Sequence, residues 1–87
     1  MAISTASLVN KVKGLSELSE RLSSEVACAS QDLKIYADRL AMLARGSRSG
    51  EEATSVIRES ARTLSNVASA ISLVMRDCDL YTRNAVR

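Results

Sequence analysis

Apolar residues recur every three or four positions through the first half of the chain, and this spacing predicts a long amphipathic helix. The predicted stripe consists of Leu8, Val12, Leu15, Leu22, Val26, Ala29, Leu33, Tyr36, Leu40 and Leu43. Only Ser19 interrupts the series, which is long enough to suggest a coiled coil. Gly14 lies inside this helix and costs about 1 kcal/mol relative to alanine, so we expect the first turns to fray or bend there. The helix is predicted to span about residues 4–45.

The second half repeats the same alternation. The predicted stripe consists of Ile57, Ala61, Leu64, Ala68, Ile71, Met75, Cys78 and Ala85. Thr82 is the one break in it. This pattern predicts a second helix over about residues 51–86.

Residues 46–50, Gly-Ser-Arg-Ser-Gly, separate the two stripes. Gly46 can adopt the left-handed conformation that ends a helix, and Ser49 followed by Glu52 forms a capping box that begins one. Stop and start signals this close together predict a short turn. The fold class is therefore all-α, a two-helix antiparallel hairpin that occupies residues 1–87 as a single domain.

Composition excludes several kinds of chemistry. The chain has no histidine, so a Ser-His-Asp triad and a Cys/His zinc site are both impossible. Its three glycines form no phosphate-binding loop, and its net charge of +2 is spread along the sequence. We expect no enzyme activity, no catalytic residue, no metal, no cofactor and no nucleic-acid partner.

The sequence also bears on membranes and export. The longest uncharged stretch, residues 63–75, is shorter than the roughly 20 apolar residues that a membrane-spanning helix needs. Residues 1–10 lack the basic and apolar regions of a Sec signal. We expect a chain that is made in the cytoplasm, does not insert into membranes and, if exported, leaves by another route.

The two cysteines are predicted to be free thiols. In a hairpin that folds about Arg48, the numbers of facing residues add to about 96, which places Cys28 opposite Ala68 and Cys78 opposite Leu18. The thiols then lie roughly 15 Å apart along the axis, which is too far for a disulfide. Both are interpreted as small core residues.

The sequence contains more apolar positions than one helix pair can bury. Cys28, Ile35 and Met42 form one additional line, and further lines follow the second helix. Such surface favours association with copies or with a partner chain. The predicted interface residues are Ile35, Met42, Leu73, Val74, Leu80, Tyr81 and Val86. A three-helix monomer, with the first helix broken at Gly14, is the alternative that would cover these lines internally.

Three short motifs resemble the needle subunits of type III secretion systems. Residues 74–79, Val-Met-Arg-Asp-Cys-Asp, and the final Arg87 are similar to the C-terminal helix of that family. Residues 15–20, Leu-Ser-Glu-Leu-Ser-Glu, and 38–41, Asp-Arg-Leu-Ala, resemble its earlier motifs, so the likeness covers about residues 15–87. The family's Pro-x-x-Pro turn and its N-terminal tryptophan are absent here.

The resemblance implies a hairpin subunit that self-assembles into a hollow helical filament for the export of effector proteins. It also implies export without a cleavable signal, a location at the cell surface, and partners that include export chaperones and a needle-tip protein. The C-terminal helix would face the lumen. The charges that match the family's lumen and polymer-contact region are Arg76, Asp77, Asp79, Arg83 and Arg87. A solvated helix end is the alternative explanation for them.

Two other functions remain open. The size, the Ser/Ala content and the glycine-containing turn are similar to the Trp-x-Gly class of type VII secretion substrates, which are dimeric hairpins. The turn lacks the tryptophan, and Tyr81-x-x-x-Ala85 lacks the acidic residue of that class's export signal. A cytoplasmic secretion chaperone or adaptor that binds a partner helix is the other alternative.

Overall fold

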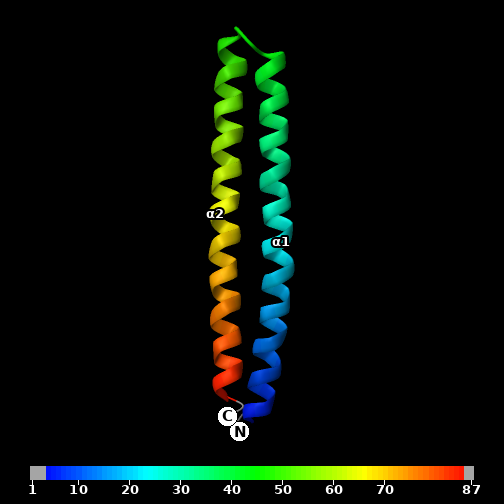
Figure 1. Cartoon of the computed structure of the whole chain (residues 1–87), viewed down its shortest axis with the longest axis vertical. Helices are drawn as coiled ribbons and strands as arrows, with labels where there is room; N and C mark the ends of the chain where they lie inside the picture. Colours follow the sequence, from blue (N-terminus) through cyan, green and yellow to red (C-terminus); the bar gives the residue numbers. More distant parts are fainter. Residues whose placement is uncertain (1–3, 86–87) are drawn as a thin grey trace.

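The computed structural model describes residues 4–85 and confirms the antiparallel hairpin. Helix α1 spans Thr5–Leu43 and helix α2 spans Arg48–Ala85, and the two lie side by side over their whole length (Figure 1). The molecule measures 65 × 20 × 14 Å. It is therefore a single layer of two helices joined at one end.

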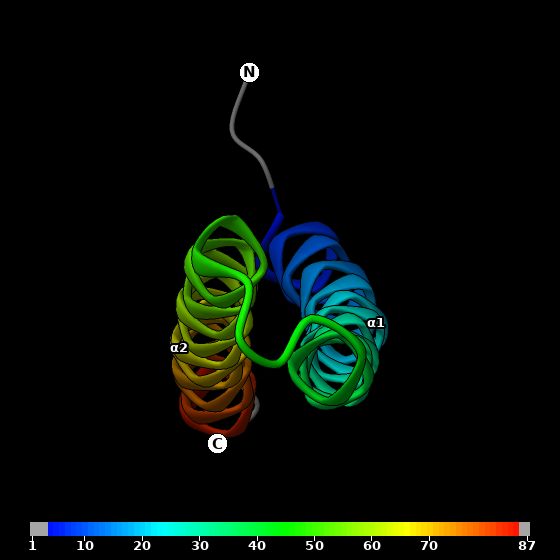
Figure 2. The same ribbon diagram turned by 90° about the horizontal axis from the view of Figure 1, so that it is seen from above.

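Within residues 4–85 no third helix covers this layer, as the view along the long axis shows (Figure 2). Helix α1 continues through Gly14 without a break. The three-helix alternative is wrong within the described residues, because the local cost of one glycine is small beside the contacts that α1 makes with α2 along its length. Fraying or bending of the first turns at Gly14 stays a prediction.

The ends of α1 follow the sequence signals. The Ser4 hydroxyl accepts a hydrogen bond from the Ser7 amide at 3.2 Å and caps the first turn. At the other end, the Ala44 amide bonds to the Leu40 carbonyl at 2.8 Å, and Gly46 has a φ of 84°. The left-handed conformation predicted for Gly46 is confirmed.

Helix α2 begins three residues earlier than the sequence predicted. The Gly50 amide donates to the Ser47 hydroxyl at 3.3 Å, so Ser47 is the capping residue, and the capping box proposed at Ser49 is wrong. The early start places Gly50 directly against Ala44, where any Cβ on Gly50 would collide with the Cβ of Ala44. The absence of a side chain at Gly50 therefore lets the helices approach closely at the turn.

The two helices contact each other along a strip of residues that we call the seam. The apolar stripe predicted for α2 lies within this seam and is confirmed. The seam consists of two lines of residues spaced seven apart. One line of α2 is small except for Met75, and we call it the small-residue line: Thr54, Ala61, Ala68, Met75 and Thr82. The other begins with large residues and ends with two small ones, and we call it the large-residue line: Ile57, Leu64, Ile71, Cys78 and Ala85. All of these side chains are buried or half-buried. Thr82, which interrupts the apolar pattern, lies within the seam.

The stripe predicted for α1 is half wrong. Its large-residue line is in the seam as expected and consists of Val12, Ser19, Val26, Leu33 and Leu40. The other half of the seam is a small-residue line of Val9, Ser16, Ser23, Ser30, Ala37 and Ala44. The residues predicted in its place are exposed instead: Leu8, Leu15, Leu22, Ala29, Tyr36 and Leu43. The seam of α1 thus lies about 50° around the helix from its most hydrophobic side, which is half of the 100° between successive residues.

Serine hydroxyls explain this rotation. Ser30 donates to the carbonyl of Ala61 at 2.7 Å, and Ser23 donates to the carbonyl of Ala68 at 3.1 Å. Such bonds from one helix to the backbone of the other require close approach, which small residues on both sides allow. A leucine at these positions would force the helices apart.

Close approach leaves the hairpin with a very small core. Eight of the described residues are buried, and none of them is larger than valine. The accessible surface is 6620 Å², whereas a compact monomer of 9.4 kDa exposes roughly 5,000 Å². Most of the large apolar side chains therefore remain in contact with solvent.

Candidate self-association surfaces

One side of the hairpin carries an exposed apolar line on each helix. These lines, which we call the apolar face, comprise Leu8, Leu15, Leu22, Ala29, Tyr36 and Leu43 of α1 with Ala53, Ser60, Val67, Val74 and Tyr81 of α2. The large members are between 37% and 87% exposed. No charged residue belongs to either line.

Helical geometry places both lines on the same side. At 100° per residue, each exposed line lies next to the large-residue line of its own helix and away from the small-residue line. The large-residue lines are themselves only partly covered: Val26, Leu33, Leu64 and Ile71 are half-buried. The apolar face and the seam therefore form one continuous hydrophobic surface.

Two further apolar lines follow the outer edges of the hairpin. The α1 edge consists of Cys28, Ile35 and Met42, and the α2 edge consists of Leu73 and Leu80. Met42 is 71% exposed and Leu73 53%. The edges point away from the seam, on opposite sides of the molecule. Exposed apolar residues thus occupy three sides of the hairpin.

The predicted interface residues all lie on these surfaces where the structure describes them. Ile35 and Met42 belong to the α1 edge, Leu73 and Leu80 to the α2 edge, and the remaining two, Val74 and Tyr81, to the apolar face. Val86 lies outside the described residues. The sequence missed the α1 half of the apolar face, because it placed those residues in the seam.

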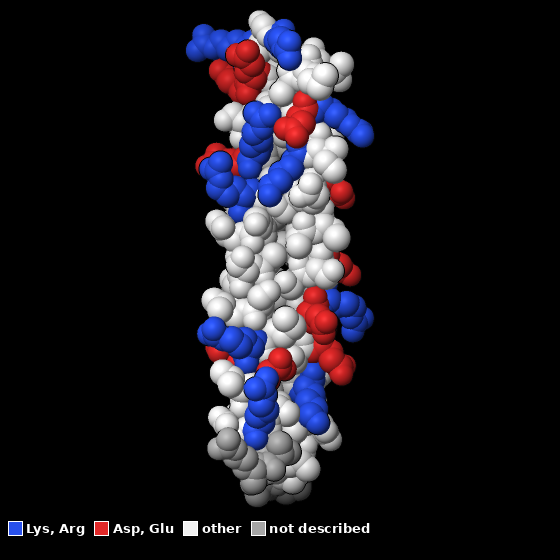
Figure 3. Space-filling view, in the orientation of Figure 1, with Lys and Arg blue, Asp and Glu red and all other residues white. Residues whose placement is uncertain are grey.

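The fourth side of the hairpin is polar. Lys34, Asp38, Arg58 and Arg62 line a shallow groove there, and the Arg58 guanidinium pairs with the Asp38 carboxylate at 3.2 Å. Figure 3 shows basic and acidic side chains of both helices above and below an uncharged middle. We call this side the polar face. It contrasts with the charge-free apolar face.

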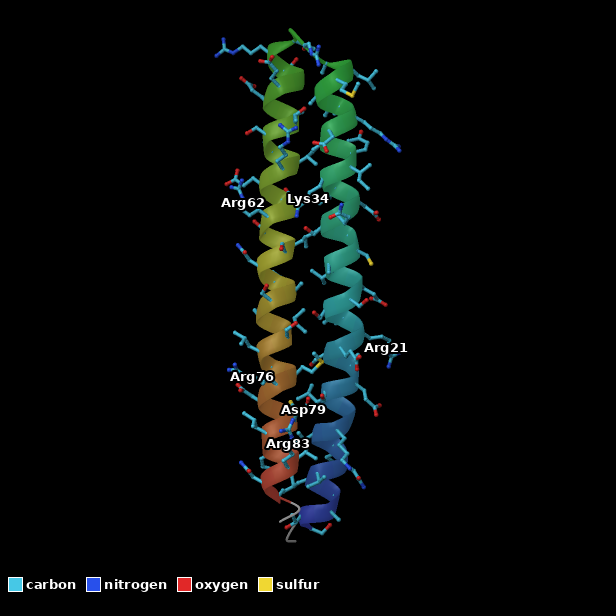
Figure 4. The ribbon with its side chains drawn as sticks, in the orientation of Figure 1. Arg21, Lys34, Arg62, Arg76, Asp79 and Arg83 are labelled. Carbon is cyan, nitrogen blue, oxygen red and sulfur yellow. The ribbon has the colours of Figure 1, made fainter. Side chains whose placement is uncertain are left out.

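The charges predicted near the C-terminus form no single cluster. Arg76 and Asp77 approach to 3.9 Å on the surface of α2, while Asp79 accepts a hydrogen bond from the Ser16 hydroxyl of α1 at 3.0 Å. Asp79 and Arg83 lie over the seam on the polar face, whereas Arg76 projects from the side of α2 (Figure 4). Arg87 lies outside the described residues.

The two thiols have different environments. Cys78 is buried in the seam, as predicted, and Cys28 is exposed on the α1 edge, so its assignment to the core is wrong. Both cysteines are free, which confirms that the hairpin contains no bridge between them.

Between residues 4 and 85, no group of three or more histidine, cysteine, aspartate or glutamate side chains is arranged to hold a metal ion. In the same part of the chain, neither helix has a segment of the length and hydropathy needed to span a bilayer. Comparison of the chain with models of known protein families, with curated proteins and with solved structures returns no match.

Proposed function

We propose that the chain is the structural subunit of a self-assembling filament, the needle of a type III secretion system. The observation that carries this proposal is the exposure of large apolar side chains on three sides of a hairpin whose own core contains none. Burying one half-exposed leucine or tyrosine against a neighbour contributes about 1 kcal/mol. Fourteen large apolar side chains of the described residues are exposed, nine of them leucine or tyrosine, so association is strongly favoured.

The distribution of these residues favours an open assembly over a closed pair. The hairpin exposes roughly 1,600 Å² more than a compact monomer of its mass, which is about twice the ~800 Å² that one partner contributes to a standard interface. A single symmetric contact would cover the apolar face and leave both edges in water. Further contacts that join the edges of successive copies would cover the remaining surfaces and extend the assembly into a filament.

The sequence motifs support a needle in particular. Asp38-Arg39-Leu40-Ala41 lies in the last turns of α1, at the position before the turn that the resemblance to needle subunits implies. The similar C-terminal segment, residues 74–79, lies on α2 and contributes Val74 to the apolar face. The polar face carries Asp79 and Arg83 and would remain in contact with water, in the lumen or outside.

One observation favours the type VII-like dimer as a second candidate. The turn contains glycine, as in that class, although it lacks the tryptophan. Gly50 is required for the close contact with Ala44. A dimer of this kind would use the apolar face alone, so the edges distinguish the two candidates.

Electron microscopy of the purified chain over a range of concentrations tests the proposal. We expect filaments that lengthen as concentration rises. The variant Leu80→Asp, on the α2 edge, should remain helical but form no filament, whereas the control Ser69→Asp, on an exposed polar position of the same helix, should assemble normally. Particles of fixed size at every concentration would contradict the needle and favour the dimer. A stable one-to-one complex with a different protein would favour an adaptor.

A further inference from the structure

We infer that the first contact of this assembly joins two copies of the chain, apolar face to apolar face, with both turns at the same end. The inference deepens the proposed self-assembly by naming the surface that pairs first. It leaves the two edges free for later growth. Three features of the hairpin carry it.

The first feature is the half-covered seam. The large-residue lines of both helices lie between the small-residue lines and the apolar face. When a second hairpin covers the apolar face, the large-residue lines come to lie at the centre of four helices. Leu33, Leu64 and Ile71, now half-buried, would then form the core of a four-helix bundle. The hairpin has the layout of half of such a bundle.

The second feature is the length of the apolar face. It runs from Leu8 to Leu43 on α1 and reaches Tyr81 on α2, which is nearly the whole length of the 65 Å hairpin. A short peptide would cover only part of it. A second copy presents an apolar face of the same length and, like the first, without charge. A copy is therefore the occupant that fits.

The third feature is the charge at the margin of the apolar face, and it selects the orientation. The marginal line of α1 consists of Lys11, Leu18, Glu25, Asp32 and Arg39, and all of these except Leu18 are charged. If the two copies pointed in opposite directions, α1 would lie on α1 of the other copy. Full overlap would then place Glu25 beside the copy's Glu25 and Lys11 near its Arg39. These like charges would repel one another.

With both turns at the same end, α1 lies on α2 of the copy. The marginal line of α2 is almost uncharged and consists of Val56, Thr63, Ala70, Asp77 and Asn84. No like charges then meet at full overlap. The two-fold axis runs along the hairpin, so residues of α1 and of the copy's α2 keep the same relative height as within one chain. Cross-helix contacts indicate that height: the numbers of Asp38 and Arg58 add to 96, and those of Ser16 and Asp79 add to 95.

Disulfide trapping tests the contact and its orientation. In a chain with Cys28→Ser and Cys78→Ala, we would introduce Ala29→Cys in one preparation and Val67→Cys in another. These two positions also add to 96 and belong to facing lines of the apolar face. On mixing and mild oxidation, we expect the dominant disulfide to join one chain of each kind. A chain with Leu22→Cys alone should not link to itself.

Two outcomes would overturn the inference. Efficient self-linking of the Leu22→Cys chain would show that the copies point in opposite directions. Absence of the mixed disulfide at concentrations where the chain sediments at twice its own mass would show that another surface pairs first.

Sedimentation of single variants separates this inference from the proposed function. Leu22→Glu, on the apolar face, should keep its helical content but sediment at the mass of one chain, while the control Ser24→Glu should still pair. Leu80→Asp should pair but not grow. Filaments formed by the Leu22→Glu chain would overturn the pairing inference and leave the needle standing. If the unsubstituted chain forms pairs but never filaments, the needle proposal fails and the pairing inference stands.

Discussion

Positions 36 and 37 provide the sharpest test of the seam, because the sequence pattern and the structure assign them opposite roles. Tyr36 is 59% exposed, and Ala37 is completely buried between the helices. The substitution Ala37→Leu would insert an isopropyl group where the two backbones approach closely. Overpacking of this kind costs about 1–3 kcal/mol of unfolding free energy.

The neighbouring substitution Tyr36→Ala should cost much less. Truncating a fully buried aromatic side chain costs about 3–5 kcal/mol, but less than half of the Tyr36 side chain is removed from water. Alanine also has a helix propensity about 0.5 kcal/mol more favourable than that of tyrosine. The net loss in unfolding free energy should be about 1 kcal/mol or less.

Urea unfolding followed by circular dichroism measures both values, at concentrations where each variant sediments as a single chain. We expect Ala37→Leu to lower the midpoint clearly more than Tyr36→Ala, with similar dependence on urea in both variants. If Tyr36→Ala were the more damaging change, the seam would contain Tyr36, and the account of the exposed apolar face would be wrong.

Two further predictions concern the turn and the serine contacts. Gly50→Ala should lower the unfolding free energy by about 1–3 kcal/mol because the new Cβ collides with Ala44. Gly14→Ala should raise it by about 0.5–1 kcal/mol, because the space around the new Cβ is open. Thermal unfolding that changes in the same direction for both variants would contradict this. Ser30→Ala should cost about 0.5–1.5 kcal/mol through loss of its bond to the Ala61 carbonyl, while exposed Ser24→Ala should cost nothing measurable in the same assay.

Sequence periodicity was sufficient for the fold because the two helices are long and the turn signals are strong. It also identified the eight apolar residues of the α2 seam, but it did not include Thr54 and it treated Thr82 as a break, because a hydropathy pattern does not recognise threonine as a seam residue. The positive φ of Gly46 and the free thiols followed from the same hairpin geometry.

Periodicity failed for α1 because two stripes of equal spacing share one large-residue line. The stripe with Leu15 and Leu22 is more hydrophobic, but the stripe with Ser23 and Ser30 allows closer approach and hydrogen bonds to the α2 backbone. A hydropathy pattern counts apolar residues and does not register small ones. Serine and alanine recur every seven residues from Ser16 to Ala44, as alanine does at Ala61 and Ala68 on α2. This repeat of small residues was the signal that could have identified the true seam.

The same limitation affected the candidate site. The edges were found from the sequence because they lie outside any plausible seam. The α1 half of the apolar face was missed because its leucines were assigned to the core. Once those residues are placed on the surface, the tendency to associate becomes stronger than the sequence alone suggested.

Sedimentation equilibrium over a wide dilution series tests most directly whether this hairpin buries its apolar surfaces against other copies. The account predicts an average mass that approaches the 9.4 kDa of one chain only at high dilution and rises through twice that value to larger species as concentration increases. A constant mass of one chain at every concentration, with helical content retained, would contradict it.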